Sequence, residues 1–135
     1  MDRGPIESSV KRYFAERDDV AVAYLFGSVA RDAARPDSDV DVGVLFFTLP
    51  DDPYERVGTH IIADLTSRLG VDVDVVVLNR APIDLVHRVL REGRIVAERD
   101  RSRRIAFEVD ARNRYFDLLP VLQRYRRQGD GELRG

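Results

Sequence analysis

The sequence predicts a single α/β domain in which a small sheet is flanked by helices. Short apolar runs of strand length alternate along the chain with longer segments whose apolar residues recur every three or four positions. This alternation is typical of a sheet with helices packed on it. The 135 residues are 44% hydrophobic, which suits one compact core. We expect the folded domain to span residues 1–127 and a flexible tail to follow at 128–135.

The chain opens with the pattern of an amphipathic helix followed by a strand. The helical pattern begins after Pro5 and stops at Asp18, and its apolar positions are Ile6, Val10, Tyr13 and Phe14. Residues 20–26 then form an apolar run of strand length that ends abruptly at Gly27. A glycine at the end of a strand suits a tight turn into a helix, and we expect a short helix at residues 28–35.

A second strand and the most regular helix of the chain follow. Residues 39–47 alternate valine with polar or small residues, so Asp39 and Asp41 are expected on one face of the strand. Pro53 suits the first position of a helix, which Gly70 ends. The apolar positions of this helix recur every four residues: Val57, Ile61, Leu65 and Leu69.

The remaining elements are a third strand, a helix, a brief fourth strand and a long terminal helix. Residues 71–78 are rich in valine, which favours a buried strand with Asp72 and Asp74 on the same side. A helix is expected at 82–92 and a brief strand at 94–97. The terminal helix is marked by Ile105, Val109, Phe116, Leu119 and Leu122.

Composition excludes several classes of protein. The chain has 22 basic and 24 acidic residues, a net charge of -2, so we expect no general affinity for DNA or RNA. It has no cysteine, which excludes disulfides, zinc-thiolate sites and thiol nucleophiles. It has neither a signal-like start nor an apolar run long enough to cross a membrane. We therefore expect a cytoplasmic protein without a membrane partner.

Three carboxylates on two predicted strands are candidates for a metal site. Asp39 and Asp41 lie side by side, and Asp74 belongs to a strand that could be their neighbour. Like charges at this spacing repel, and a hard divalent cation such as Mg²⁺ or Mn²⁺ would offset the repulsion. The alternative is that Asp39 caps its strand while Asp72 and Asp74 alternate on a solvated edge.

The Gly27-Ser28 pair favours the metal site over this alternative, because it is expected where a strand turns into a helix. Backbone N–H groups at such a turn attract phosphate oxygens, and glycine lets them approach closely. Ser28 adds a hydroxyl donor, and Arg31 lies one turn later with a guanidinium that can face the same anion. A phosphate turn and paired carboxylates together indicate a site for a phosphate ligand with its metal ions.

These residues resemble the signature of a known family. Residues 27–46 read GSVARDAARPDSDVDVGVLF, which is similar to the Gly-Ser-x-Ala-Arg…Ser-Asp-x-Asp motif of the minimal nucleotidyltransferases in the DNA polymerase β-like superfamily. Residues 71–82, VDVDVVVLNRAP, resemble the strand that carries the family's third carboxylate. The resemblance covers nearly the whole chain and implies a small mixed sheet flanked by helices, with a long C-terminal helix.

The resemblance also implies roles for individual residues. It implies that the Gly27-Ser28 turn holds the β- and γ-phosphates of ATP, with Arg31 facing the pyrophosphate. Asp39 and Asp41 would ligate two Mg²⁺ ions, or Mn²⁺ in their place. Asp74 would complete the site of the second ion and help to remove the proton of an acceptor hydroxyl.

The chain departs from the family pattern at two positions. Asp32 stands where the family commonly has glycine after the motif arginine, and Val77 stands where a further acid is often found. Asp72 is the fallback for the third carboxylate if Asp74 does not serve.

Small single-domain members of this family resemble the antitoxin of a two-gene pair whose partner is a HEPN ribonuclease toxin. The resemblance implies transfer of AMP from ATP to a tyrosine of that toxin. A chain of about 135 residues leaves little room for a dedicated small-molecule pocket, which favours a protein acceptor. The alternatives are nucleotidylation of a small hydroxylated molecule such as an aminoglycoside, and a non-catalytic binding antitoxin. Either a hetero-oligomer with the toxin or a homodimer is compatible with these hypotheses.

Overall fold

The computed structural model describes residues 3–27, 39–49 and 54–134, and its elements follow the predicted order. The expected short helix at 28–35 lies outside the described residues. The elements are α1 (Arg3–Ala15), β1 (Val20–Phe26), β2 (Val40–Phe46), α3 (Tyr54–Leu69), β3 (Val73–Val77), α4 (Ile83–Glu92), β4 (Arg94–Glu98) and α5 (Arg101–Arg134). The predicted α/β class is confirmed, and the strand and helix ends fall within a few residues of those expected from the sequence.

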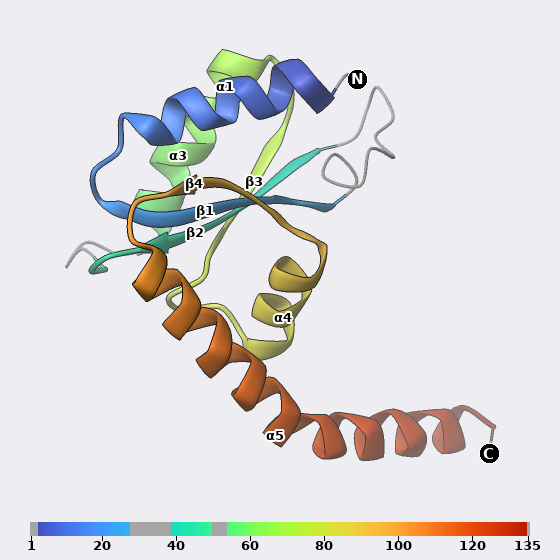
Figure 1. Cartoon of the computed structure of the whole chain (residues 1–135). Coiled ribbons are helices and arrows are strands. Elements are labelled where there is room, and N and C mark those ends of the chain that lie inside the picture. The colour runs from blue at the N-terminus through green and yellow to red at the C-terminus, as the bar shows by residue number, and fades with distance from the viewer. Residues whose placement is uncertain (1–2, 28–38, 50–53, 135) are drawn as a thin grey trace.

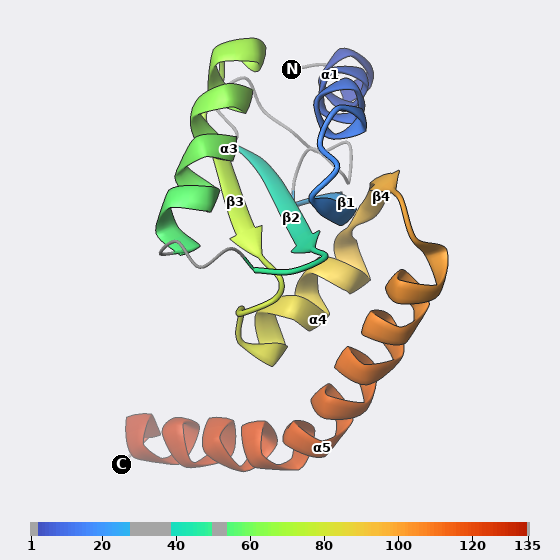
Figure 2. The same ribbon diagram turned by 90° about the vertical axis from the view of Figure 1, so that its left-hand side faces the viewer.

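The four strands form one mixed sheet in the order β3-β2-β1-β4. β1 runs antiparallel to both of its neighbours, whereas β2 and β3 are parallel and are joined through α3. In the described part of the chain β3 and β4 are therefore the edge strands. Figure 2 shows α1 and α3 on one side of the sheet and α4 and α5 on the other.

Each face of the sheet has its own apolar core, because alternate strand residues point to opposite sides. On the first face the buried side chains of β1, β2 and β3 pack against α1 and α3, with Phe14, Ile61 and Leu65 nearly inaccessible to solvent. On the second face they pack against α4 and α5, with Val89 and Ala111 at the centre. Both faces of the central strands are covered, which explains their almost unbroken apolar sequences.

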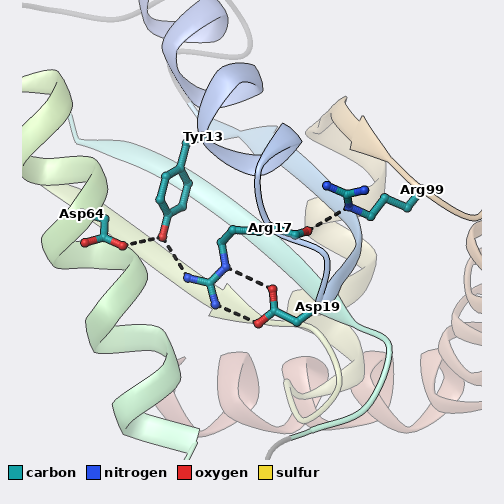
Figure 3. Close-up of polar contacts among 5 residues, drawn as sticks. All are labelled: Tyr13, Arg17, Asp19, Asp64 and Arg99. Carbon is teal, nitrogen blue, oxygen red and sulfur yellow. Dashed lines mark hydrogen bonds and ion pairs between the residues drawn. The ribbon is translucent and has the colours of Figure 1, made fainter.

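A polar network ties the first helical layer together (Figure 3). The hydroxyl of Tyr13 in α1 donates to Asp64 Oδ2 in α3 at 2.8 Å and accepts from Arg17 at 3.0 Å. Arg17 also makes two hydrogen bonds to Asp19, at 3.1 and 2.8 Å. Arg99, which follows β4, donates to the carbonyl oxygen of Arg17 at 2.8 Å. Segments from three parts of the chain are thereby fixed around the start of β1.

The long helix α5 packs on the sheet only through its first part and then extends away from it (Figure 1). The buried Tyr24 of β1 donates its hydroxyl to Glu108 Oε1 at 2.9 Å, which anchors the helix to the central strands. Pro120 lies inside α5, and a proline inside a helix removes a hydrogen bond and favours a bend. The helix includes residues 128–134, and the expected boundary between domain and tail at residue 127 stays a prediction. None of the described helices is long and apolar enough to cross a membrane.

Candidate active site

The candidate site lies where β2 and β3 begin, on the face of the sheet that α4 covers. The parallel register places Asp41 of β2 directly opposite Asp74 of β3. Asp39 lies two residues before Asp41 and so belongs to the same face. Asp39 and Asp74 are exposed, whereas Asp41 is half-buried. The strand register thus brings together carboxylates that are 33 positions apart in the chain (74 − 41).

The register also separates the two candidates for the third carboxylate. Asp74 is the residue opposite Asp41, whereas Asp72 precedes β3 and has no register partner in β2. The carbonyl oxygen of Asp72 accepts a hydrogen bond from the Val40 N–H at 2.9 Å, so its backbone helps to align the two strands at their start.

Gly27 directly follows β1, lies beside Asp41 and has a left-handed backbone, with φ of +77°. A Cβ atom at this position would stand 2.2 Å from Asp41 Oδ2 and 3.1 Å from its Cγ. Any side chain at residue 27 would therefore displace the carboxylate. The sequence predicted that this glycine is needed for close approach of phosphate, and the geometry adds that it makes space for Asp41.

Burial and the neighbouring charges together shift the pKa of Asp41. Burial raises the pKa of the Asp41 carboxyl, and the negative charge of Asp74 raises it further. The positive charge of Arg88 lowers this pKa, while Asp39 and Glu92 contribute smaller increases. The face thus concentrates negative charge, and carboxylate oxygens are the donors that Mg²⁺ and Mn²⁺ prefer.

The described carboxylates do not form a group of three metal ligands. Among residues 3–27, 39–49 and 54–134, no three acidic, histidine or cysteine side chains stand close enough to hold a metal ion. The type of donor fits a hard divalent cation, but the side chains would have to converge around it.

Helix α4 brings two charged residues to this face that the sequence did not lead us to expect. Arg88 and Glu92 are one turn apart and form an ion pair, with 3.3 Å between Arg88 Nε and Glu92 Oε2. The spacing of this pair could be read from the sequence. Its position at the carboxylates could not, because that depends on which face of the sheet α4 covers.

The other predicted site residues, Ser28 and Arg31, lie outside the described residues, as does Asp32. The structure therefore places four of the six predicted site residues, namely Gly27, Asp39, Asp41 and Asp74.

The sequence matches the model of the family "Polymerase beta, Nucleotidyltransferase" over residues 8–102. This match includes all four strands and most of the chain. The protein therefore belongs to the polymerase beta nucleotidyltransferase family. No curated protein sequence matches the chain.

Solved structures with the same fold include chains from toxin–antitoxin complexes. One, from a toxin–antitoxin complex with AMP-PNP, superposes with a TM-score of 0.71 at 22% identity, over 96% of this chain and 98% of that one. Another, from a complex of a tri-AMPylated Shewanella oneidensis HEPN toxin with an MNT antitoxin, has a TM-score of 0.68 at 21% identity, over 98% and 99% of the two chains.

A protein assigned to the minimal nucleotidyltransferases has a TM-score of 0.56 at 30% identity, over 70% of this chain and 95% of that one. The polymerase β-like fold implied by the sequence motif is therefore confirmed, with its mixed sheet and long C-terminal helix.

Proposed function

We propose that the chain is a metal-dependent nucleotidyltransferase that moves AMP from ATP to a tyrosine hydroxyl of a partner HEPN toxin and so acts as its antitoxin. The observation that carries the proposal is the pairing of Asp41 with Asp74 beside Gly27. Two structural relatives support the nucleotide and the acceptor, since one was solved with AMP-PNP and the other with a tri-AMPylated HEPN toxin. The proposal places the protein in the cytoplasm, where ATP is available.

In the proposed site Asp39 and Asp41 would hold two Mg²⁺ ions, or Mn²⁺ in their place, and Asp74 would complete the site of the second ion. The negative charge gathered around Asp41 supports this assignment, because a cation would relieve it. Bound divalent ions would neutralise the triphosphate and lower the pKa of the acceptor hydroxyl.

The residues of the chain would position the triphosphate and accept a proton. The Gly27-Ser28 turn would donate hydrogen bonds to the β- and γ-phosphates, and Arg31 would balance charge on the leaving pyrophosphate. The acceptor oxygen forms a bond to the α-phosphorus while the bond to the oxygen bridging the α- and β-phosphates breaks. Pyrophosphate leaves with that bridging oxygen, and the proton of the acceptor hydroxyl passes to the Asp74 carboxylate.

The position of Asp74 favours an acceptor supplied by another macromolecule. Asp74 is exposed and lies on β3, an edge strand in the described part of the sheet. A hydroxyl on a large partner can therefore approach from outside the sheet without any rearrangement of its core. A tyrosine projecting from the surface of a folded protein meets this requirement.

The proposal is tested by incubating the full chain with the HEPN protein, α-labelled ATP and Mg²⁺. We expect label on the HEPN protein, its loss with Asp74→Asn, and its retention with the matched control Asp72→Asn. Label that appears only on an added aminoglycoside would instead identify a small-molecule nucleotidyltransferase. Inhibition of the toxin by an Asp41→Asn chain without any label would identify a binding antitoxin.

A further inference from the structure

The second half of α4 is held over the strands that carry the candidate site. Gly43, two residues after Asp41 and on the same face, packs against this helix: a Cβ there would be only 2.8 Å from Val89 Cγ1. At the end of the helix Gly93 packs against Tyr24 of β1, where a Cβ atom would be 3.3 Å from the Tyr24 Cβ. The position of α4 over β1 and β2 is therefore fixed by two close backbone contacts.

This placement brings Arg88 to the end of β1. The guanidinium carbon of Arg88 lies 5.9 Å from the centre of the Phe26 ring. Phe26 is the register partner of Asp41 and directly precedes Gly27. A positive charge on α4 thus stands near Asp41 and Gly27, where the predicted phosphate turn begins. Its effect on the pKa of Asp41 agrees with this position.

A phosphate group can replace Glu92 as the partner of the Arg88 guanidinium. The Arg88 side chain is 51% exposed, and its ion pair with Glu92 joins a single nitrogen, Nε, to one carboxylate oxygen at 3.3 Å. A guanidinium carries five N–H donors in a planar fork that matches two oxygens of a phosphate. A bidentate contact with phosphate is stronger than a partly exposed single contact with a carboxylate.

We propose that Arg88 binds the phosphates of the substrate nucleotide from the α4 side, facing Gly27 across the triphosphate. On binding, the guanidinium leaves Glu92 and takes up phosphate oxygens. The inference rests on the proposed function only in that the ligand is a nucleoside triphosphate, and it does not depend on the acceptor.

The test measures nucleotide binding without catalysis. Calorimetry would give the Kd of a non-hydrolysable ATP analogue with Mg²⁺ for the full chain and for Arg88→Ala, Arg88→Lys and Arg91→Ala. Arg91 is the matched control because it is also a positive charge on α4 and lies 3.8 Å from the Glu92 carboxylate. We expect Arg88→Ala to weaken binding at least about tenfold, Arg88→Lys to recover part of this loss, and Arg91→Ala to change little.

A second measurement separates phosphate binding from an effect on the carboxylates. Binding of Mn²⁺ alone, followed by electron paramagnetic resonance, should not weaken in Arg88→Ala, and circular dichroism should show an intact fold. The inference is wrong if Arg88→Ala binds the analogue as tightly as Arg91→Ala, or if Mn²⁺ binding falls in parallel. If the unaltered chain binds no analogue, the inference and the proposed function both fail. If it binds the analogue but labels no HEPN protein, only the proposed acceptor is wrong.

Discussion

Replacing Gly27 by alanine should damage the candidate site far more than it destabilises the fold. The left-handed backbone at Gly27, with φ of +77°, costs an alanine about 1–2 kcal/mol. In a domain of this size that loss lowers Tm by roughly 4–8 °C. The new Cβ would also stand 2.2 Å from Asp41 Oδ2, so the carboxylate would have to retreat by roughly 1 Å. A displacement of this size at a reacting centre costs on the order of 100-fold in rate.

Gly70→Ala is the matched control for this experiment. Gly70 has nearly the same backbone, with φ of +71°, but nothing lies within 4 Å of the position that its Cβ would occupy. Thermal unfolding should show similar losses of stability for both variants. Transfer of labelled AMP and the binding of nucleotide with Mg²⁺ should fall sharply only in Gly27→Ala. If Gly27→Ala retains the activity of Gly70→Ala, the carboxylate that Gly27 accommodates is not part of the site.

Four further outcomes are expected for stability. In metal-free buffer at neutral pH, Asp41→Asn should raise the free energy of unfolding by up to about 1 kcal/mol, because it removes a like-charge pair across the strands. The control Asp117→Asn, at an exposed position of α5, should leave the free energy of unfolding unchanged. Since the pKa of Asp41 is raised in the folded chain, its destabilising effect should grow as pH rises through that pKa, and urea titrations at several pH values would detect this. The Asn79 amide makes two hydrogen bonds, of 2.9 and 3.0 Å, to the backbone of Phe46 at the end of β2. Asn79→Ala should therefore lower the free energy of unfolding, measured by urea titration, by about 1–3 kcal/mol. Hydrogen bonds from Arg17 lower the pKa of Asp19, so the ionised carboxylate stabilises the folded chain. The unaltered chain should therefore be more stable than Asp19→Asn at neutral pH, and this difference should shrink as pH falls below about 3.9. Thermal unfolding at several pH values would measure the difference.

Much of the fold could be predicted because the periodicity of the apolar residues is clean. The strand at Val20–Phe26 was expected with the bounds that the structure has, and the helix Tyr54–Leu69 was expected to begin one residue earlier. The shared face of Asp39 and Asp41 also follows from the sequence, because side chains alternate along any strand. These features depend on the spacing of residues that are close together in the chain, and this spacing can be read directly from the sequence.

The parts of the site that could not be predicted depend on how distant elements meet. The family resemblance predicted that Asp74 joins Asp39 and Asp41, but its position directly opposite Asp41 depends on the register of two parallel strands, which no local pattern fixes. The position of Arg88 depends on which side of the sheet α4 covers. The close fit between Gly27 and Asp41 depends on both the backbone at the end of β1 and the neighbouring strand.

The parallel register of β2 and β3 limits how this chain can change its length. After α3 the chain turns at Gly70 and enters β3 within three residues, so the turn sets the position along the sheet at which Asp74 arrives. Deleting or inserting one residue there would turn every side chain of β3 to the opposite face. Asp74 would then point into the apolar layer beneath α3, and a neighbouring valine would take its place opposite Asp41. Relatives that keep the chemistry should therefore vary in length elsewhere and preserve the length of this turn.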